Sequence, residues 1–139
     1  MFRSLINVLL QVLISVCACS PTFLELLKQD DKHPSTLQLA VECMNEDDTK
    51  LRLYGVMLAK VCLEKDPYVL GSVHTRSLPF YLLHTFVESE GDERVEAEAL
   101  AAIHIVIKHN VEVGYIYTAL LFSIYTDTVK KIPRLSISY

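Results

Sequence analysis

Histidine and cysteine are the side chains of this sequence best suited to binding a metal ion, and their spacing argues against a metal site. The closest two of the five histidines, His104 and His109, are five residues apart and diverge around a helix. Cys17 and Cys19 form a Cys-x-Cys pair, but no second pair follows. Because a structural zinc ion needs four converging ligands, we expect no bound metal.

A run of carboxylates is the other group of residues that could carry chemistry. Its members are Glu88, Glu90, Asp92, Glu93, Glu96 and Glu98. A paired-carboxylate catalytic site needs two such groups fixed in a cleft, whereas these surround the start of a predicted helix, where the helix dipole favours acidic groups. The sequence also contains no glycine-rich phosphate loop and no Gly-x-Ser-x-Gly turn. We therefore expect no catalytic residue, no cofactor and no enzymatic activity.

The composition is typical of one compact helical protein. The 139 residues are 51% hydrophobic and 22% charged, which suffices for one sizeable core. Four glycines and five prolines are few for a protein of short strands and tight turns. The net charge of -4 argues against a basic nucleic-acid surface, and the only basic cluster, Lys130, Lys131 and Arg134, is short. We predict an all-α protein without a nucleic-acid partner.

The location of the protein has two interpretations. All four cysteines lie in apolar runs, as buried thiols do in a reducing compartment, so we expect the cytoplasm, with the nucleus as a second location. However, Arg3 precedes an apolar stretch with the layout of a secretory signal peptide. Asn7, Gln11 and Ser15 recur every four residues, which favours a packed helix with one polar stripe. The alternative is a secreted or lumenal protein from which residues 1–20 are removed; the stretch is too short to span a membrane.

Apolar periodicity and capping residues predict a series of helices with short polar breaks. We expect helices at Phe2–Cys19, Pro21–Gln29, Ser35–Met44, Thr49–Lys65, Leu78–Glu88 and Asp92–Asn110, a short segment at Pro67–Val73 and a last apolar stretch at Val113–Tyr125. The residues Asp30–Pro34 are predicted to form a loop. This order indicates packed helices throughout.

Comparing the chain with itself reveals a repeat. A shift that places Asp48 on Asp92 also aligns a basic residue and a set of aliphatic or small residues on one helical face. The small residues Gly55 and Ala99 become equivalent, at a position where neighbouring helices could approach closely. A similar shift aligns the first helix with Thr49–Lys65. Helices that stack on their equivalents bury surface that no single repeat can bury alone, so we predict an α-solenoid of about two and a half to three units.

The region from Asp66 to Asn110 resembles the armadillo repeat. In that family a repeat ends in a Leu-Pro-x-Leu-Val-like helix, here Leu78-Pro79-Phe80-Tyr81-Leu82, and the next begins Asp-Glu-x-Val-x-x-Glu-Ala, here Asp92 to Ala99. HEAT repeats are close relatives and stay an alternative. The resemblance, which extends over a domain of residues 1–127, implies a right-handed superhelix. It also implies a concave groove that receives a peptide, a disordered segment or a partner helix.

The resemblance implies a protein-binding groove on nine residues. They are Gln11, Ser15, Met57, Lys60, Val61, Ala101, His104, Ile105 and Lys108. The tryptophan and asparagine ladder of import receptors and catenins would fall on Met57 and Val61, and again on Ala101 and Ile105. Because these positions are apolar, we expect the groove to bury a partner's aliphatic or aromatic side chains rather than to hold a peptide backbone. The alternative is that these apolar residues are ordinary core.

The C-terminal end departs from the repeat pattern. After Tyr125 no second helical stripe follows, and residues 128–139 are predicted to form a basic, irregular tail. An unfinished last repeat leaves apolar surface uncovered. We expect either that this end docks on a partner or on another copy of the chain, or that the chain is a fragment or isoform of a longer repeat protein, and we favour the second.

Overall fold

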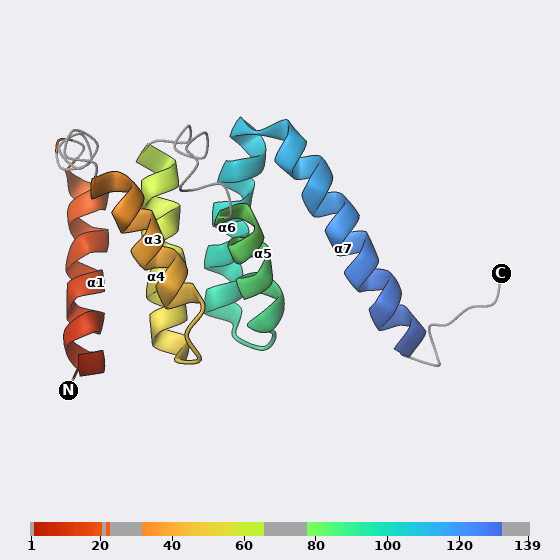
Figure 1. Ribbon diagram of the computed structural model, residues 1–139, viewed down its shortest axis with the longest axis horizontal. Coiled ribbons are helices and arrows are strands. Elements are labelled where there is room, and N and C mark those ends of the chain that lie inside the picture. The colour runs from red at the N-terminus through yellow and green to blue at the C-terminus, as the bar shows by residue number, and fades with distance from the viewer. Residues whose placement is uncertain (1, 21, 23–31, 66–77, 132–139) are drawn as a thin grey trace.

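The chain folds into helices throughout the part that can be described. The computed structural model describes residues 2–20, 22, 32–65 and 78–131. Within these ranges the helices are α1 (Phe2–Cys19), α3 (Lys32–Met44), α4 (Thr49–Lys65), α5 (Leu78–Glu88), α6 (Glu93–His109) and α7 (Val111–Lys131), and there is no strand (Figure 1). The all-α prediction is confirmed. Of the predicted helix Pro21–Gln29 only Thr22 is described, and the segment Pro67–Val73 lies outside the described residues.

The helices pack in two layers. α1, α4 and α6 lie side by side, with α4 in contact with both of its neighbours. α3 packs on α4, α5 packs on α6, and α3 also contacts α5. α7 follows α6 and projects away from the other helices (Figure 1). The residues expected to form a groove therefore come from the three helices of one layer.

A single glycine sets the distance between α3 and α4. A Cβ atom on Gly55 would lie 2.7 Å from the Ala40 carbonyl oxygen and 2.9 Å from the Met44 amide nitrogen. These are backbone atoms, so only a residue without a side chain lets the two helices come this close. The sequence comparison placed a close helix approach at Gly55, and the structure confirms it; the equivalent Ala99 is fully buried.

Part of the carboxylate run caps α6. The Asp92 side chain accepts a hydrogen bond from the Val95 amide at 3.3 Å, and the Glu96 carboxylate accepts one from the Gly91 amide at 2.9 Å. Gly91 has a φ of 94°, which a residue with a side chain rarely adopts. Asp48 plays the same capping role for α4, accepting from the Lys50 amide at 2.9 Å. The two aspartates satisfy amides that the first helical turn leaves unpaired, and Glu96 satisfies an amide of the preceding turn.

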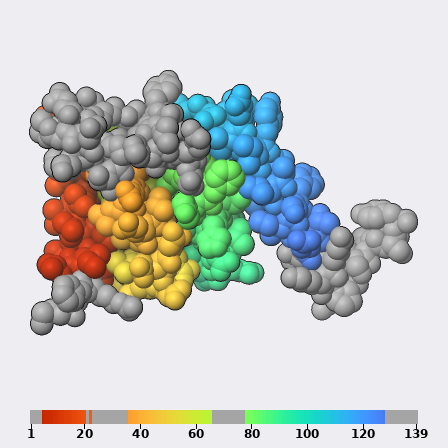
Figure 2. All heavy atoms as spheres, in the orientation of Figure 1, coloured from red at the N-terminus to blue at the C-terminus, as the bar shows by residue number. Residues whose placement is uncertain are grey.

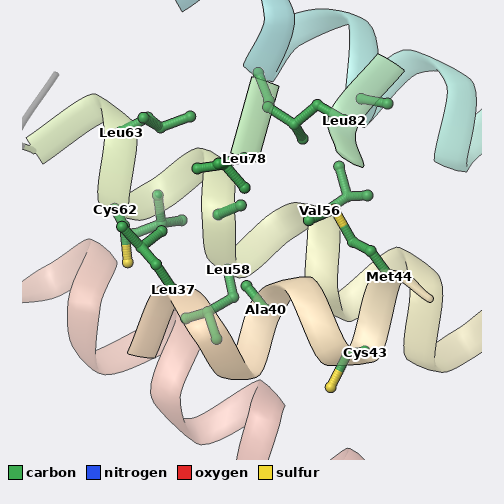
Figure 3. Close-up of a cluster of buried hydrophobic side chains, with 14 of the residues drawn as sticks. Leu37, Ala40, Cys43, Met44, Val56, Leu58, Cys62, Leu63, Leu78 and Leu82 are labelled. Atoms are coloured by element: carbon green, nitrogen blue, oxygen red, sulfur yellow. The ribbon is translucent and has the colours of Figure 1, made fainter. Parts of the chain in front are cut away.

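The core runs through the interface between the two layers. Its centre is built by buried apolar side chains of α3, α4 and α5 (Figure 3), namely Leu37, Ala40, Cys43, Met44, Val56, Leu58, Cys62, Leu63, Leu78 and Leu82. From α1, Leu10, Ile14 and Cys17 join the same cluster. α1 therefore contributes buried side chains and is not a surface addition.

The predicted bounds of two helices, α3 and α7, are wrong. α3 begins at Lys32, so residues 32–34 are helical rather than part of a loop. Pro34 fits there because the first turn of a helix does not use its amide hydrogens. α7 ends at Lys131, so residues 128–131 of the expected irregular tail are also helical. No glycine or proline interrupts the sequence between Gly114 and Pro133, which leaves the helix without an earlier stop.

Tyr117 anchors α7 to the rest of the protein. Its side chain is 2% exposed, and its hydroxyl donates a hydrogen bond of 2.6 Å to the Pro79 carbonyl oxygen at the start of α5. Burial raises the pKa of this phenol above its ordinary value of 10.0. The neutral hydroxyl is therefore the form that the folded protein holds.

We expect Tyr117→Phe to lower the free energy of unfolding at pH 7 by about 1 kcal/mol, because one buried hydrogen bond is lost. The advantage of the wild type should persist below pH 10 and shrink above it, by about 1.4 kcal/mol per pH unit, since only the unfolded tyrosine ionises there. Urea denaturation of both proteins between pH 7 and pH 11 measures this difference. A difference that does not change with pH would show that Tyr117 is accessible to water in the folded state.

Candidate protein-binding face

The nine expected groove residues lie on three neighbouring helices of one layer. Gln11 and Ser15 belong to α1; Met57, Lys60 and Val61 belong to α4; Ala101, His104, Ile105 and Lys108 belong to α6. Within α4 and within α6 the spacings of three and four residues place the side chains on one helical face. Two side-chain contacts, described next, join these faces across the helix boundaries. We call the resulting surface the α1–α4–α6 face.

The first contact joins α1 to α4. The Gln11 side-chain amide donates a hydrogen bond of 3.1 Å to the Tyr54 hydroxyl. Gln11 is exposed and Tyr54 is half-buried, so this bond lies at the edge of the face rather than in the core. Tyr54 was not among the expected site residues. Tyr54 lies three residues before Met57 on the same helix, and this spacing could have indicated that both side chains share one face.

The second contact joins α4 to α6. The Lys60 ammonium nitrogen lies 2.5 Å from a Glu98 carboxylate oxygen, and each side chain is about one-quarter exposed, at 23%. Lys60 was expected to flank the groove, and no partner was predicted for its charge. The structure instead pairs its charge with Glu98, because the two helices pack closely enough for the side chains to meet. The exposed lysine among the nine residues is then Lys108.

The apolar centre of the face is only partly accessible. Met57 of α4 and Ile105 of α6 pack against the core and are half-buried. Ala101, one helical turn before Ile105, is also half-buried. Val61 is 7% exposed and belongs to the core cluster, so it offers a partner little surface. Of the two interpretations of these apolar positions, ordinary core and partner-binding surface, each therefore applies to different residues. Val61 is core, whereas Met57, Ala101 and Ile105 keep surface that a partner can cover.

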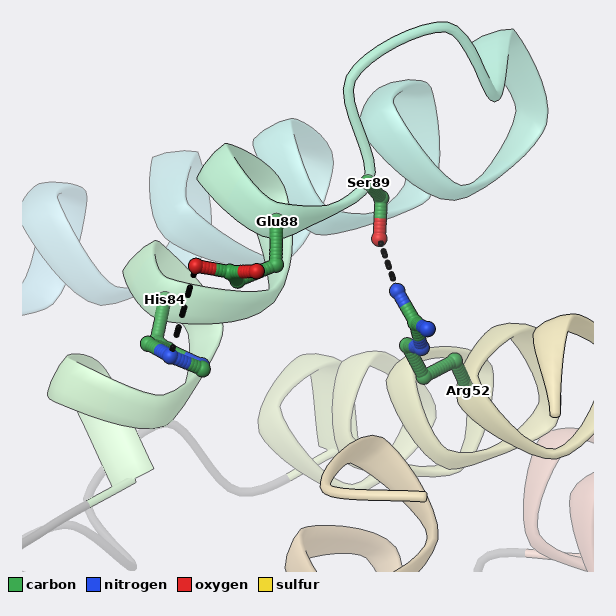
Figure 4. Close-up of polar contacts among 4 residues, drawn as sticks. All are labelled: Arg52, His84, Glu88 and Ser89. Carbon is green, nitrogen blue, oxygen red and sulfur yellow. Dashed lines mark hydrogen bonds and ion pairs between the residues drawn. The ribbon is translucent and has the colours of Figure 1, made fainter. Parts of the chain in front are cut away.

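A separate polar hollow lies at the turn between α3 and α4, next to α5. Arg52 organises it: the guanidinium donates to the carbonyl oxygens of Glu46 at 2.9 Å and Asp47 at 3.3 Å, and to the Ser89 hydroxyl at 3.4 Å (Figure 4). On the α5 side of the hollow, the His84 Nε2 atom lies 3.9 Å from the Glu88 Oε1 atom. Arg52 thus ties the turn after α3 to the turn after α5. No motif in the sequence signalled this clamp.

The cysteines are free thiols in different surroundings. Cys17 of α1 and Cys62 of α4 are fully buried and share a hydrogen bond, which lowers the pKa of Cys17 and raises that of Cys62. Burial raises the pKa of Cys43. Cys19 is exposed, against the expectation that all four thiols are buried. Within the described ranges no three His, Cys, Asp or Glu side chains are grouped so that they could hold a metal ion.

Comparisons with known proteins give no relative. No protein-family model, no curated protein and no solved structure matches this chain. Among the helices of residues 2–20, 32–65 and 78–131, none is long and apolar enough to cross a membrane. The function must therefore be argued from the residues and their geometry.

Proposed function

We propose that this chain is a protein-interaction module of the armadillo-like type, a right-handed α-solenoid of about two and a half to three repeats that holds a protein partner on the α1–α4–α6 face. The observation that carries the proposal is the half-buried apolar strip of Met57, Ala101 and Ile105 on two adjacent helices. The two-layer packing and the equivalence of Gly55 and Ala99 support the repeat architecture.

The chemistry of the face suggests the kind of partner. A strip of aliphatic side chains is covered by aliphatic or aromatic residues, as an amphipathic helix or an extended segment presents them. The exposed Lys108 and His104 lie beside Ile105 and favour an acidic residue at the edge of that segment. We further propose that the protein acts by binding alone, without catalysis, cofactor or nucleic acid, in the cytoplasm or nucleus.

Met57→Glu and Ile105→Glu should each weaken partner binding at least about tenfold, because a buried carboxylate in an apolar contact is left unpaired. Immobilised wild type and variants are incubated with the same cell extract, and retained proteins are quantified by mass spectrometry. Tyr81→Glu on α5 is the matched control, since Tyr81 is also half-buried but belongs to the other layer.

Circular dichroism and thermal unfolding of each variant separate lost binding from lost folding. Partners that are released by both Met57→Glu and Ile105→Glu, yet retained by Tyr81→Glu, support the proposed face. Partners that are retained by the first two variants and released by Tyr81→Glu would move the binding site to the layer of α3 and α5.

A secreted or lumenal protein lacking residues 1–20 is the alternative. What favours retention of this segment is that Leu10, Ile14 and Cys17 fill the core beside α4. If residues 1–20 were removed, the mature protein would lack α1, one of the three helices of the proposed binding face. The two locations also predict different mature N-termini, which N-terminal sequencing of the purified protein distinguishes.

A further inference from the structure

The outer part of α7 is an apolar helix without a packing surface of its own. Residues 113–126 contain no charged side chain. After the buried Tyr117, every residue from Thr118 to Asp127 is exposed. The helix stands away from the other helices as a separate ridge (Figures 1 and 2). A helix that is apolar on all sides is normally buried, so this segment differs from the helices of the two layers.

The sequence of this segment is poorly suited to an isolated helix. Tyrosine, isoleucine, threonine and phenylalanine have lower helix propensities than alanine, leucine or lysine, and they dominate the stretch from Tyr115 to Thr126. Short isolated helices are marginal in water, and tertiary packing supplies most helical stability in proteins. The outer part of α7 therefore requires a surface to pack against.

The exposed side chains of α7 include a regular stripe. Val111, Tyr115, Thr118, Phe122 and Tyr125 are all exposed, and they are separated by four, three, four and three residues. This is the 3.5-residue period that keeps one face of a helix turned toward a second helix. An open hollow lined by Leu121, Phe122 and Tyr125 lies beside the stripe and can receive a side chain from that second helix.

We propose that α7 pairs with α7 of a second copy, antiparallel, around a two-fold axis near Thr118. The stripe is nearly symmetric about this residue, so reversing it places Val111 opposite Tyr125 of the other copy and Tyr115 opposite its Phe122. Such self-complementarity is what a two-fold interface requires, since each contact then occurs twice. Thr118 is small, and its hydroxyl donates to the Gly114 carbonyl oxygen at 2.8 Å, so two helices can approach closely at the centre.

The size and charge of the stripe fit such a pair. Tyr115, Phe122 and Tyr125 are 72%, 66% and 66% exposed. At roughly 150–250 Å² for each aromatic residue, these three alone present roughly 300–500 Å². The exposed Val111 and Leu121 extend this area toward the roughly 800 Å² per partner of a standard interface. The uncharged seam buries no unpaired ion. The pairing uses none of the residues of the α1–α4–α6 face, so either proposal can fail alone.

Sedimentation equilibrium of the full chain tests the pairing. We expect a reversible monomer–dimer equilibrium. Phe122→Asp should raise its dissociation constant at least about 30-fold, because the substitution removes an aromatic hot spot from each copy. Leu9→Asp is the matched control on α1, because Leu9 is also apolar and 50% exposed, and it should leave the dimer unchanged. A dimer abolished by Leu9→Asp but not by Phe122→Asp, or a wild type that stays monomeric, would overturn the proposal.

Engineered cysteines test the direction of the pair. In a background with the exposed Cys19 changed to serine, Thr118→Cys should cross-link two copies under mild oxidation by oxidised glutathione. Val111→Cys alone should not, because an antiparallel pair holds the two positions roughly 20 Å apart, far beyond the reach of a disulfide. Val111→Cys mixed with Tyr125→Cys should cross-link. Efficient cross-linking of Val111→Cys with itself would contradict antiparallel pairing. A wild-type monomer that binds lipid vesicles, with binding lost in Phe122→Asp, would identify a membrane surface instead of a second copy as the occupant of the stripe.

Discussion

Replacing Gly55 with valine is expected to lower the free energy of unfolding by about 3 kcal/mol, at the upper end of the cost of overpacking a core. The new Cβ would lie 2.7 Å from the Ala40 carbonyl oxygen and 2.9 Å from the Met44 amide nitrogen. Both are backbone atoms of α3, so no side chain can turn aside to relieve the contact. The helix α3 must move as a whole, and it carries Leu37 and Ala40 of the core with it. Urea denaturation followed by circular dichroism measures the loss.

Gly114→Ala is the control for the intrinsic preference of helices for alanine, which stabilises by up to about 1 kcal/mol. At Gly114 a Cβ would meet only the Ile107 side chain, at 3.2 Å, and a side chain can shift by a few tenths of an ångström. We therefore expect Gly114→Ala to be neutral or slightly stabilising. Equal effects of Gly55→Val and Gly114→Ala would mean that α3 does not pack on α4 at the distance seen here.

Local signals in the sequence predicted most of the helices. The ranges Phe2–Cys19, Thr49–Lys65 and Leu78–Glu88 agree with the structure because a cap, a proline or a turn residue marks their ends. The close approach at Gly55 was also predictable, since the repeat placed a small residue there and at Ala99. These features depend on residues close in sequence or on a repeated pattern. Neither requires knowledge of which side chains meet across helices.

The contacts that depend on tertiary packing were not predictable. Lys60 meets Glu98, and Arg52 reaches Ser89, only because α6 packs on α4 and α5 packs on α6. No spacing within one helix encodes either pair. Only Lys60 of these residues was expected at the candidate site, and no partner was predicted for its charge. The chemistry of that face is therefore less basic than the sequence suggested.

Equivalent positions in the repeat also differ in burial at the ends of the stack. Val56 is fully buried, whereas the aligned Leu100 is 47% exposed; Leu51 is buried, whereas the aligned Leu5 is 66% exposed. The middle helix α4 has a neighbouring helix on each side in its layer. Among the described residues, α1 has only α4 beside it in that layer, and α7 projects away from α6. Burial therefore follows the presence of a neighbouring helix, which the repeated pattern does not specify.

This asymmetry of α1 gives a matched pair of substitutions that tests whether the helix belongs to the folded protein. Leu10 is fully buried and Leu9, its neighbour in sequence, is 50% exposed. We expect Leu10→Ala to lower the free energy of unfolding by about 2–5 kcal/mol, through lost apolar burial and the cavity left behind. Leu9→Ala should cost at most about 1 kcal/mol, because its side chain already lies largely in water.

The comparison is informative because the two changes are chemically identical and differ only in the side of α1 that they alter. Thermal and urea unfolding of the two purified variants, with the mass of each chain checked, measure the difference. A large effect of Leu10→Ala alone requires that α1 packs on α4 in the register seen here. The free energy of unfolding of a typical domain is about 5–15 kcal/mol, so the expected loss is a sizeable fraction of it. If both variants, expressed in a secreting cell, yield mature chains that begin near residue 21 with unchanged stability, the segment is a cleaved signal peptide. The α1–α4–α6 face then reduces to α4 and α6, and Met57 and Ile105 are the residues on which partner binding depends.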